Sequence, residues 1–116
     1  MKCLIIVNES PWQTGLATCA LRFAQAASSV GLQPSAVFFR EDGVYHALGG
    51  TVADAGTPDL TAGWLEIAAR TGARLLLCSA SCQRRLPAAA SAPEFSQTGL
   101  ADMLELMREA DQLVTF

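Results

Sequence analysis

Four short apolar runs recur along the chain, and each has the length and composition of a buried strand. The runs cover residues 3–7, 36–39, 73–77 and 112–116. Apolar runs this short, rich in β-branched, leucine or aromatic residues, are typical of strands covered on both faces. The pattern therefore predicts four strands.

The segments between the first strands carry apolar residues at helical spacing. A helix is predicted between the first two strands, with a cap at Thr14 and a stop at Gly31. Its predicted inner face consists of Leu16, Cys19, Ala20, Phe23, Ala27 and Val30. After the second strand, Asp42 is expected to cap a short helical turn. The apolar residues of that turn are Val44, Tyr45 and Leu48.

Two further helices are predicted in the second half of the chain. One begins at Thr57 or Asp59 and ends at Gly72. Its predicted inner face consists of Leu60, Trp64, Ile67, Ala68 and Thr71. The other is capped by Thr98, and residues 88–95 before it are expected to form a loop. Its predicted inner face consists of Leu100, Met103, Leu104 and Met107.

The alternation of strands and helices predicts an α/β fold. Such alternation gives a parallel sheet with helices on both faces, hence a three-layer α/β/α arrangement around four to five strands. Residues 1–116 are expected to form a single domain. The carboxyl ends of the strands would gather Asn8, Arg40, His46 and Cys78 at one edge of the sheet.

The amino-acid composition limits the kinds of partner that the chain is expected to bind. Hydrophobic residues make up 51 % of the chain and charged residues only 16 %, against about 25 % charged in an average domain. This shortage of charge suggests that other subunits cover part of the surface, and Phe38, Phe39, Val44 and Tyr45 are expected at such a contact. The net charge of −3 argues against direct binding of nucleic acid. No apolar segment reaches membrane-spanning length, so a cytoplasmic location without a leader or membrane contact is expected.

Cys78 is the strongest candidate for chemistry, because it ends a buried strand at the edge where α/β proteins place their ligands. Ser79 and Ser81 can cap a helical turn whose free N–H groups would stabilise a thiolate. Arg84 and Arg85 add positive charge, which favours a reactive thiolate. The alternative is that Cys78 is only a small buried apolar residue.

The remaining candidates are His46 and the other cysteines. His46 could act as a general base, hydrogen-bond the thiolate, or be an exposed loop residue. Cys82 is either a resolving thiol for Cys78 or a residue on a helical turn. Cys3 and Cys19 are expected to be packed in the core. A zinc site needs about four ligands, and too few are in reach, so no metal and no cofactor are expected.

A low-pKa thiol with basic neighbours and no evident base suits the transfer of sulfur between thiols. It suits amide hydrolysis less well, because no cysteine, histidine and acid or amide set stands at a readable spacing. The predicted activity is therefore that of a sulfurtransferase, with Cys78 as a persulfide carrier.

Several segments together resemble the DsrE/TusD family of intracellular sulfur-relay proteins over nearly the full length. They are residues 35–39 with 42–47, Trp64, Leu77-Cys78 with Arg84-Arg85, Phe95 with Gly99-Leu100, and residues 110–116. Two departures follow Cys78: Leu86-Pro87 stands where the family often has glycine, and residues 88–92 are rich in alanine. These departures leave open whether Arg84 and Arg85 serve the thiolate or a subunit contact.

The resemblance implies a DsrE-like α/β/α domain in which Cys78 accepts sulfur. It also implies a hexamer of related subunits, in homomeric or heteromeric form. Sulfur would arrive from an upstream carrier and leave to a partner with a C-terminal cysteine, for 2-thiouridine synthesis in tRNA or for sulfur oxidation. The alternative is a non-catalytic structural subunit of such a hexamer, and a weaker one is a redox sensor through Cys78 and Cys82.

Overall fold

The computed structural model describes residues 1–12, 15–48 and 59–116. Two of the expected helix caps, Thr14 and Thr57, lie outside these described residues. Within them, no helix is both long and apolar enough to cross a membrane.

The centre of the molecule is a sheet of five strands, all parallel to their neighbours. The strand order is β4-β3-β2-β1-β5. The strands are β1 (Lys2–Val7), β2 (Gln33–Phe39), β3 (Arg74–Cys78), β4 (Phe95–Thr98) and β5 (Gln112–Thr115). The four predicted strands are all present. β4 was missed, because it is an edge strand in which only Phe95 is buried, so it carries no apolar run.

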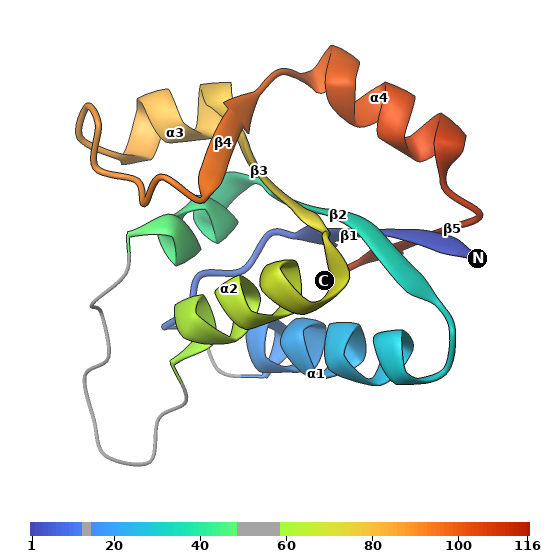
Figure 1. Cartoon of the computed structure of the whole chain (residues 1–116). Helices are drawn as coiled ribbons and strands as arrows, with labels where there is room; N and C mark the ends of the chain where they lie inside the picture. The colour runs from blue at the N-terminus through green and yellow to red at the C-terminus, as the bar shows by residue number, and fades with distance from the viewer. Residues whose placement is uncertain (13–14, 49–58) are drawn as a thin grey trace.

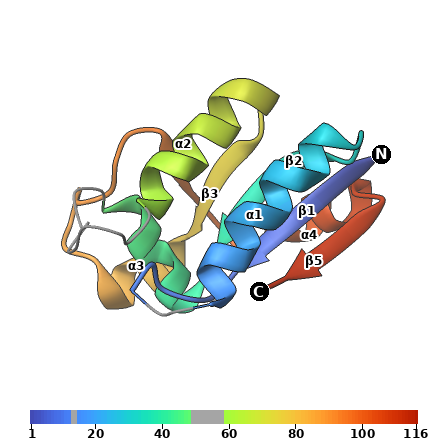
Figure 2. The ribbon, with the colours of Figure 1, turned by 90° about the horizontal axis from the view of Figure 1, so that it is seen from below.

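Helices cover both faces of the sheet, as Figures 1 and 2 show, and the predicted α/β/α class is confirmed. The helices are α1 (Leu16–Ser29), α2 (Leu60–Thr71), α3 (Ser79–Arg85) and α4 (Leu100–Glu109), with the 3-10 helix η1 (Glu41–Ala47) after β2. α1 and α2 pack on one face, and α4 lies on the other. α3 and η1 stand at the carboxyl edge of the strands.

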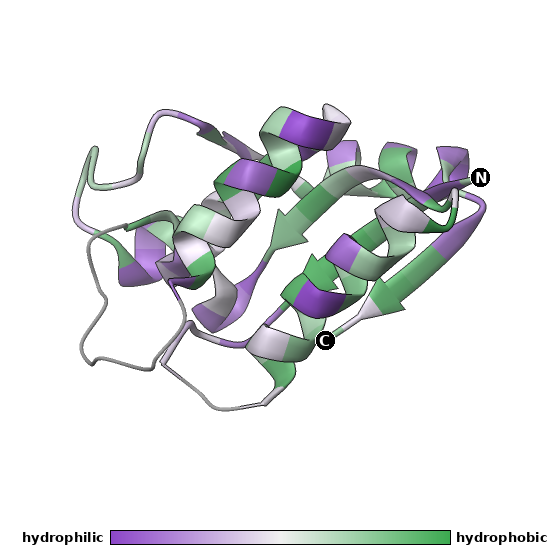
Figure 3. Ribbon diagram, turned by 60° about the horizontal axis from the view of Figure 1, so that its bottom comes forward, coloured by the Kyte–Doolittle hydropathy of each residue, from purple (hydrophilic) through white to green (hydrophobic). Residues whose placement is uncertain are grey.

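The two faces of the sheet bury separate cores, because side chains alternate along each strand. One core includes Ile5, Phe39 and Leu77 with residues of α1 and α2. The other includes Ile6, Phe38 and Cys78 with Met103 and Leu106 of α4. The central strands are accordingly apolar on both sides, whereas the helices carry polar residues outward (Figure 3).

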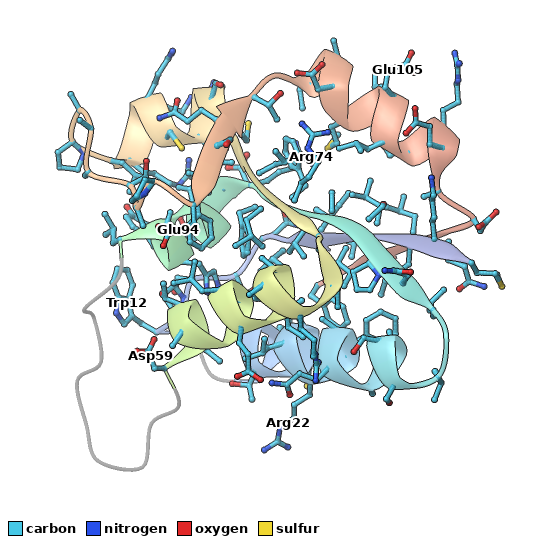
Figure 4. All side chains as sticks on the ribbon, viewed as in Figure 1. Trp12, Arg22, Asp59, Arg74, Glu94 and Glu105 are labelled. Carbon is cyan, nitrogen blue, oxygen red and sulfur yellow. The ribbon has the colours of Figure 1, made fainter. Side chains whose placement is uncertain are left out.

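The face of α1 that packs on the sheet differs from the predicted one. Ala17, Ala20, Leu21, Ala24 and Ala27 are buried, whereas Leu16, Cys19 and Val30 are exposed. The small alanines let the helix approach the sheet closely, and alanine gives only a weak hydrophobic signal in the sequence. Cys19 is therefore not a packing residue. Arg22 points away from the sheet in Figure 4.

The helix signals were right for α2 and partly wrong for α4. Asp59 caps α2 by accepting the N–H of Ala62 at 3.0 Å, and Gly72 ends the helix in a left-handed conformation, as predicted. Thr98 does not cap α4; its hydroxyl donates to the Asp102 carboxylate, and Gly99 occupies the cap position. On α4, Leu100 and Leu104 are exposed, contrary to the prediction, and Leu106 is buried instead.

Three of the four residues predicted at or near a subunit contact are buried within the chain itself. Phe38, Phe39 and Val44 have no exposed surface, because they pack into the two cores of the chain itself. Tyr45 alone among the four is partly exposed.

Candidate functional site

The carboxyl ends of three adjacent strands place Asn8, Arg40 and Cys78 side by side. Val7 on β1 is paired with Phe39 on β2, and Phe39 is paired with Leu77 on β3. Each of the three residues follows one of these paired positions. Cys78 is in turn paired with Thr98 on the edge strand β4. The sequence predicted that Asn8, Arg40, His46 and Cys78 would gather at this edge; strand register brings Asn8, Arg40 and Cys78 together there, whereas His46 packs in the core.

Cys78 closes β3 and stands at the start of α3. Its side chain joins the core under α4, and 6 % of the residue is exposed. Its φ and ψ are extended, and the helix begins at the next residue. The thiol is free and lies at the rim of the central sheet, where strand and helix meet.

The surroundings of Cys78 favour its thiolate. Burial raises the pKa of the thiol, but hydrogen bonds from the Ser81 hydroxyl and from the N–H groups of Ser81 and Ala80 lower it. The positive charge of Arg40 lowers it further, and the net result is a pKa below the usual value for cysteine. The first turn of α3 therefore does supply N–H donors to the thiol, as its sequence suggested.

Ser81 is held in place by η1. Its hydroxyl oxygen accepts the backbone N–H of Glu41 at 3.0 Å. Glu41 adopts a left-handed φ of 49°, which is uncommon for a residue with a side chain. Because that hydroxyl accepts from Glu41, its own proton remains available for Cys78. The turn after β2 thus orients a donor on α3.

Neither of the two arginines singled out from the sequence supplies the charge on the thiol. Arg85 binds Glu41 at 2.9 Å and Asp42 at 2.8 Å, which ties α3 to η1. Arg84 is exposed. The charge that acts on the thiol comes from Arg40, so the expectation that Arg84 and Arg85 provide it is corrected. The helix turns their side chains away, whereas Arg40 is the neighbour of Cys78 across the sheet.

His46 is neither an exposed loop residue nor a partner of the thiolate. It has no exposed surface, and its Nε2 lies 3.0 Å from the Glu9 carbonyl oxygen. Its ring packs against Phe39 and Trp64, on the sheet face opposite Cys78. Burial lowers the pKa of His46 to about 4, which leaves the ring neutral near pH 7. It is a core residue, so a general-base role is not supported.

Cys82 and Cys3 are buried free thiols. Burial raises the pKa of both, and the charge of Cys78 raises that of Cys82 further. Cys82 lines a pocket of about 300 Å³ together with Leu86 and Pro87 of the segment after α3 and Gln97 of β4. Cys3 is the core residue that was predicted. Cys82 lies on α3, its thiol packed in the core under α1 and α2.

Two functional features were missed or undervalued from the sequence. The sequence predicts Arg40 at this edge without a role, although a charged residue directly after a buried strand is a readable signal. It predicts Ser81 as a helix cap, whereas the structure makes it a donor to the thiol. In the part of the chain described here, no group of three histidine, cysteine or acidic residues is placed to hold a metal ion.

An exposed and a partly exposed aromatic ring stand at the same edge. Trp12 is 52 % exposed and packs against Tyr45, with ring centroids 5.1 Å apart. Figure 4 shows Trp12 at the end of the molecule where β1 ends. This pair belongs to the loop after β1 and to η1, the same elements that carry Asn8 and Glu41.

Two curated sulfurtransferases are similar to this chain over nearly its whole length. The sulfurtransferase TusD of Serratia proteamaculans (strain 568) is 33 % identical over 126 residues, covering 98 % of this chain and 97 % of the relative. The sulfurtransferase TusD of Salmonella newport (strain SL254) is 30 % identical over 128 residues, covering both chains in full.

A solved structure has the same fold. The crystal structure of the ychN protein from E. coli superposes with a TM-score of 0.85 at 22 % identity, covering 100 % of this chain and 99 % of that one. The model of the DsrE/DsrF-like family matches residues 1–116. The chain therefore belongs to the DsrE/DsrF-like family.

Proposed function

We propose that this chain is a sulfur-relay protein that accepts sulfur as a persulfide on Cys78 and passes it to a partner thiol. One observation carries the proposal: three hydrogen-bond donors and the charge of Arg40 act together on Cys78 at the sheet edge. They favour the ionised thiol, which is the form that attacks sulfur. The curated relatives that match over their full length are sulfurtransferases, which agrees with this chemistry.

The proposed transfer needs no outside oxidant or reductant. The Cys78 thiolate attacks the outer sulfur of a donor persulfide, forming a new S–S bond as the donor S–S bond breaks. The donor leaves as a thiolate and takes the electron pair of the broken bond. Cys78 now carries the outer sulfur, and a second thiolate removes it by the same exchange.

The proposed relay requires two partner proteins, one that donates sulfur and one that accepts it. Sulfur arrives from an upstream carrier protein that bears a persulfide and leaves to a partner that presents a C-terminal cysteine. The final use is 2-thiouridine synthesis in tRNA or oxidation of reduced sulfur compounds. The working assembly is a hexamer of related subunits, so size exclusion at micromolar concentration is expected to give a species larger than 12.2 kDa. A sharp monomer peak would contradict this.

Intact mass after incubation with a low-molecular-weight persulfide donor tests the proposal. The wild-type chain is expected to gain one sulfur atom, and Cys78→Ser is expected to gain none. Cys19→Ser is the matched control, because Cys19 is the exposed cysteine and reports non-specific loading. Absence of added sulfur on the wild type, or equal addition to Cys78→Ser, refutes the proposal.

If the chain is instead a purely structural subunit, the Cys78 thiol is expected to be unreactive. In that case Cys78 would resist alkylation near neutral pH, as a buried apolar thiol does. Rapid alkylation of Cys78 at pH 6, mapped by peptide mass, is the expected result and separates the two functions. The donors around the thiol do not favour the structural alternative.

A further inference from the structure

Arg40 is the next residue after β2, and its position relative to Cys78 is fixed by strand pairing. Phe39 is the register partner of Leu77, so Arg40 and Cys78 follow at the same level. Phe39 and Leu77 both face the core under α1 and α2. Arg40 keeps extended backbone angles, φ −125° and ψ 163°. Because side chains alternate along extended backbone, Arg40 and Cys78 share the opposite face of the sheet.

The backbone of Arg40 is anchored on both sides. Its N–H donates to the Val7 carbonyl at 3.0 Å, and its own carbonyl accepts the N–H of Gly43 at 2.8 Å. These bonds join Arg40 to β1 and to η1. The base of the side chain is therefore held at the rim of the sheet whether or not a ligand is present.

One nitrogen of the Arg40 guanidinium group, Nε, is buried and has no hydrogen-bond partner within the described residues. Nor does Arg40 form an ion pair with any described carboxylate. The acidic groups nearby are engaged elsewhere: Glu41 and Asp42 bind Arg85, and Asp102 accepts from Thr98. A buried guanidinium N–H without a partner is costly, which points to an anion that completes it.

We propose that Arg40 binds the ionised outer sulfur of the Cys78 persulfide. This inference rests on the proposed function and adds to it the residue that holds the transferred atom. Loading places a new sulfur beyond the Cys78 Sγ, and that sulfur ionises by losing a proton to solvent. The new anion is one atom further from the Cys78 backbone than the thiolate. The guanidinium then balances its charge until the partner thiol removes the sulfur.

If Arg40 binds the outer sulfur, replacing Arg40 and replacing Arg84 should affect Cys78 differently. A purely structural role of Arg40 does not predict such a difference. Arg40→Gln and Arg40→Met remove the charge, and Met keeps much of the aliphatic stem and its packing. Arg40→Lys keeps the charge without the forked donor. Arg84→Gln is the control, because it removes an exposed guanidinium from α3. Thermal unfolding of each variant checks that the fold is retained.

Two readouts are expected to change together. Alkylation of Cys78 at pH 6 is expected to slow by about tenfold in Arg40→Gln and Arg40→Met, because a neighbouring cation that favours the thiolate is lost. The persulfide formed from the same low-molecular-weight donor is expected to reach a lower occupancy and decay faster, as followed by intact mass. Arg40→Lys is expected to recover most of the alkylation rate, and Arg84→Gln to match the wild type.

The outcomes separate this inference from the proposed function. If the wild type gains no sulfur, the proposed function fails and this inference fails with it. If the wild type loads while both neutral variants load, hold sulfur and alkylate at the wild-type rate, only the role of Arg40 is overturned. Should Arg40→Gln be unstable, Arg40→Met and Arg40→Lys decide the matter by the same comparison.

Discussion

At the scale of single residues, the pKa of Cys78 depends on groups from two parts of the chain. Ser81 and the N–H groups of α3 follow it directly, but Arg40 is the residue after β2. Burial alone would give Cys78 a raised pKa, as it does for Cys3 and Cys82. The difference between these buried thiols therefore lies in local donors and charge, and not in their exposure.

Ser81→Ala tests the largest of the favourable contributions. Removing the hydroxyl takes away a hydrogen bond to the thiolate, so the pKa of Cys78 is expected to rise and alkylation at pH 6 to slow by roughly tenfold. The ultraviolet absorbance of the thiolate, titrated against pH, measures the shift. Ser79→Ala is the matched control, because the Ser79 hydroxyl donates to the Thr98 carbonyl instead. Identical titrations for Ser81→Ala and the wild type would exclude the donor role.

At the scale of elements, η1 connects most parts of the site. It places the N–H of Glu41 on Ser81, pairs Glu41 and Asp42 with Arg85, and follows Arg40 directly. Gly43 lets this turn lie against the end of β1, because a Cβ there would overlap the Val7 carbonyl oxygen. Close approach of two backbones is what glycine permits at this position.

Gly43→Ala is expected to disturb both stability and reactivity. The added methyl group must displace backbone, so the free energy of unfolding is expected to fall by roughly 1–3 kcal/mol. Cys78 alkylation should slow as well, because η1 orients Ser81. Gly99→Ala is the control: nothing lies within 4 Å of its Cβ position and its φ is −94°. Urea unfolding measures the first effect, and equal stability of the two variants would contradict the packing argument.

At the scale of the whole molecule, one histidine couples stability to pH. His46 is enclosed by Phe39 and Trp64 on the face of the sheet opposite Cys78. Its pKa is lowered to about 4 from an ordinary 6.5, chiefly by burial. Between these values the unfolded chain binds a proton that the folded chain does not. Stability contributed by the neutral ring is therefore complete above pH 6.5 and is lost as the pH falls toward 4.

Unfolding experiments at several pH values check this coupling. The free energy of unfolding is expected to fall between pH 6.5 and 4.5, with a slope from His46 approaching about 1.4 kcal/mol per pH unit. His46→Gln removes the titrating group and can still donate to the Glu9 carbonyl. Its stability should vary less with pH over this range. Parallel pH curves for the two proteins would show that His46 is not responsible.

Much of the fold could be read from local pattern. Apolar runs marked β1, β2, β3 and β5, and Asp59 and Gly72 marked the ends of α2, since these signals act through backbone chemistry within a few residues. β4 and the inner faces of α1 and α4 could not be read in this way. Their burial depends on which neighbour covers them, as Leu106 and the alanines of α1 demonstrate.

The sequence by itself determined the parallel α/β layout, the position of Cys78 at the end of a strand, and the resemblance to the family that the comparisons confirmed. Only the tertiary structure decided which charges act on that thiol. It set Arg40 beside Cys78 through strand register, directed Arg85 to Glu41 and Asp42, and enclosed His46. The physical reason is that the two properties depend on different neighbours. Secondary structure depends mainly on residues close in the sequence, whereas the ionisation of a side chain depends on the charges and hydrogen-bond donors that surround it in space.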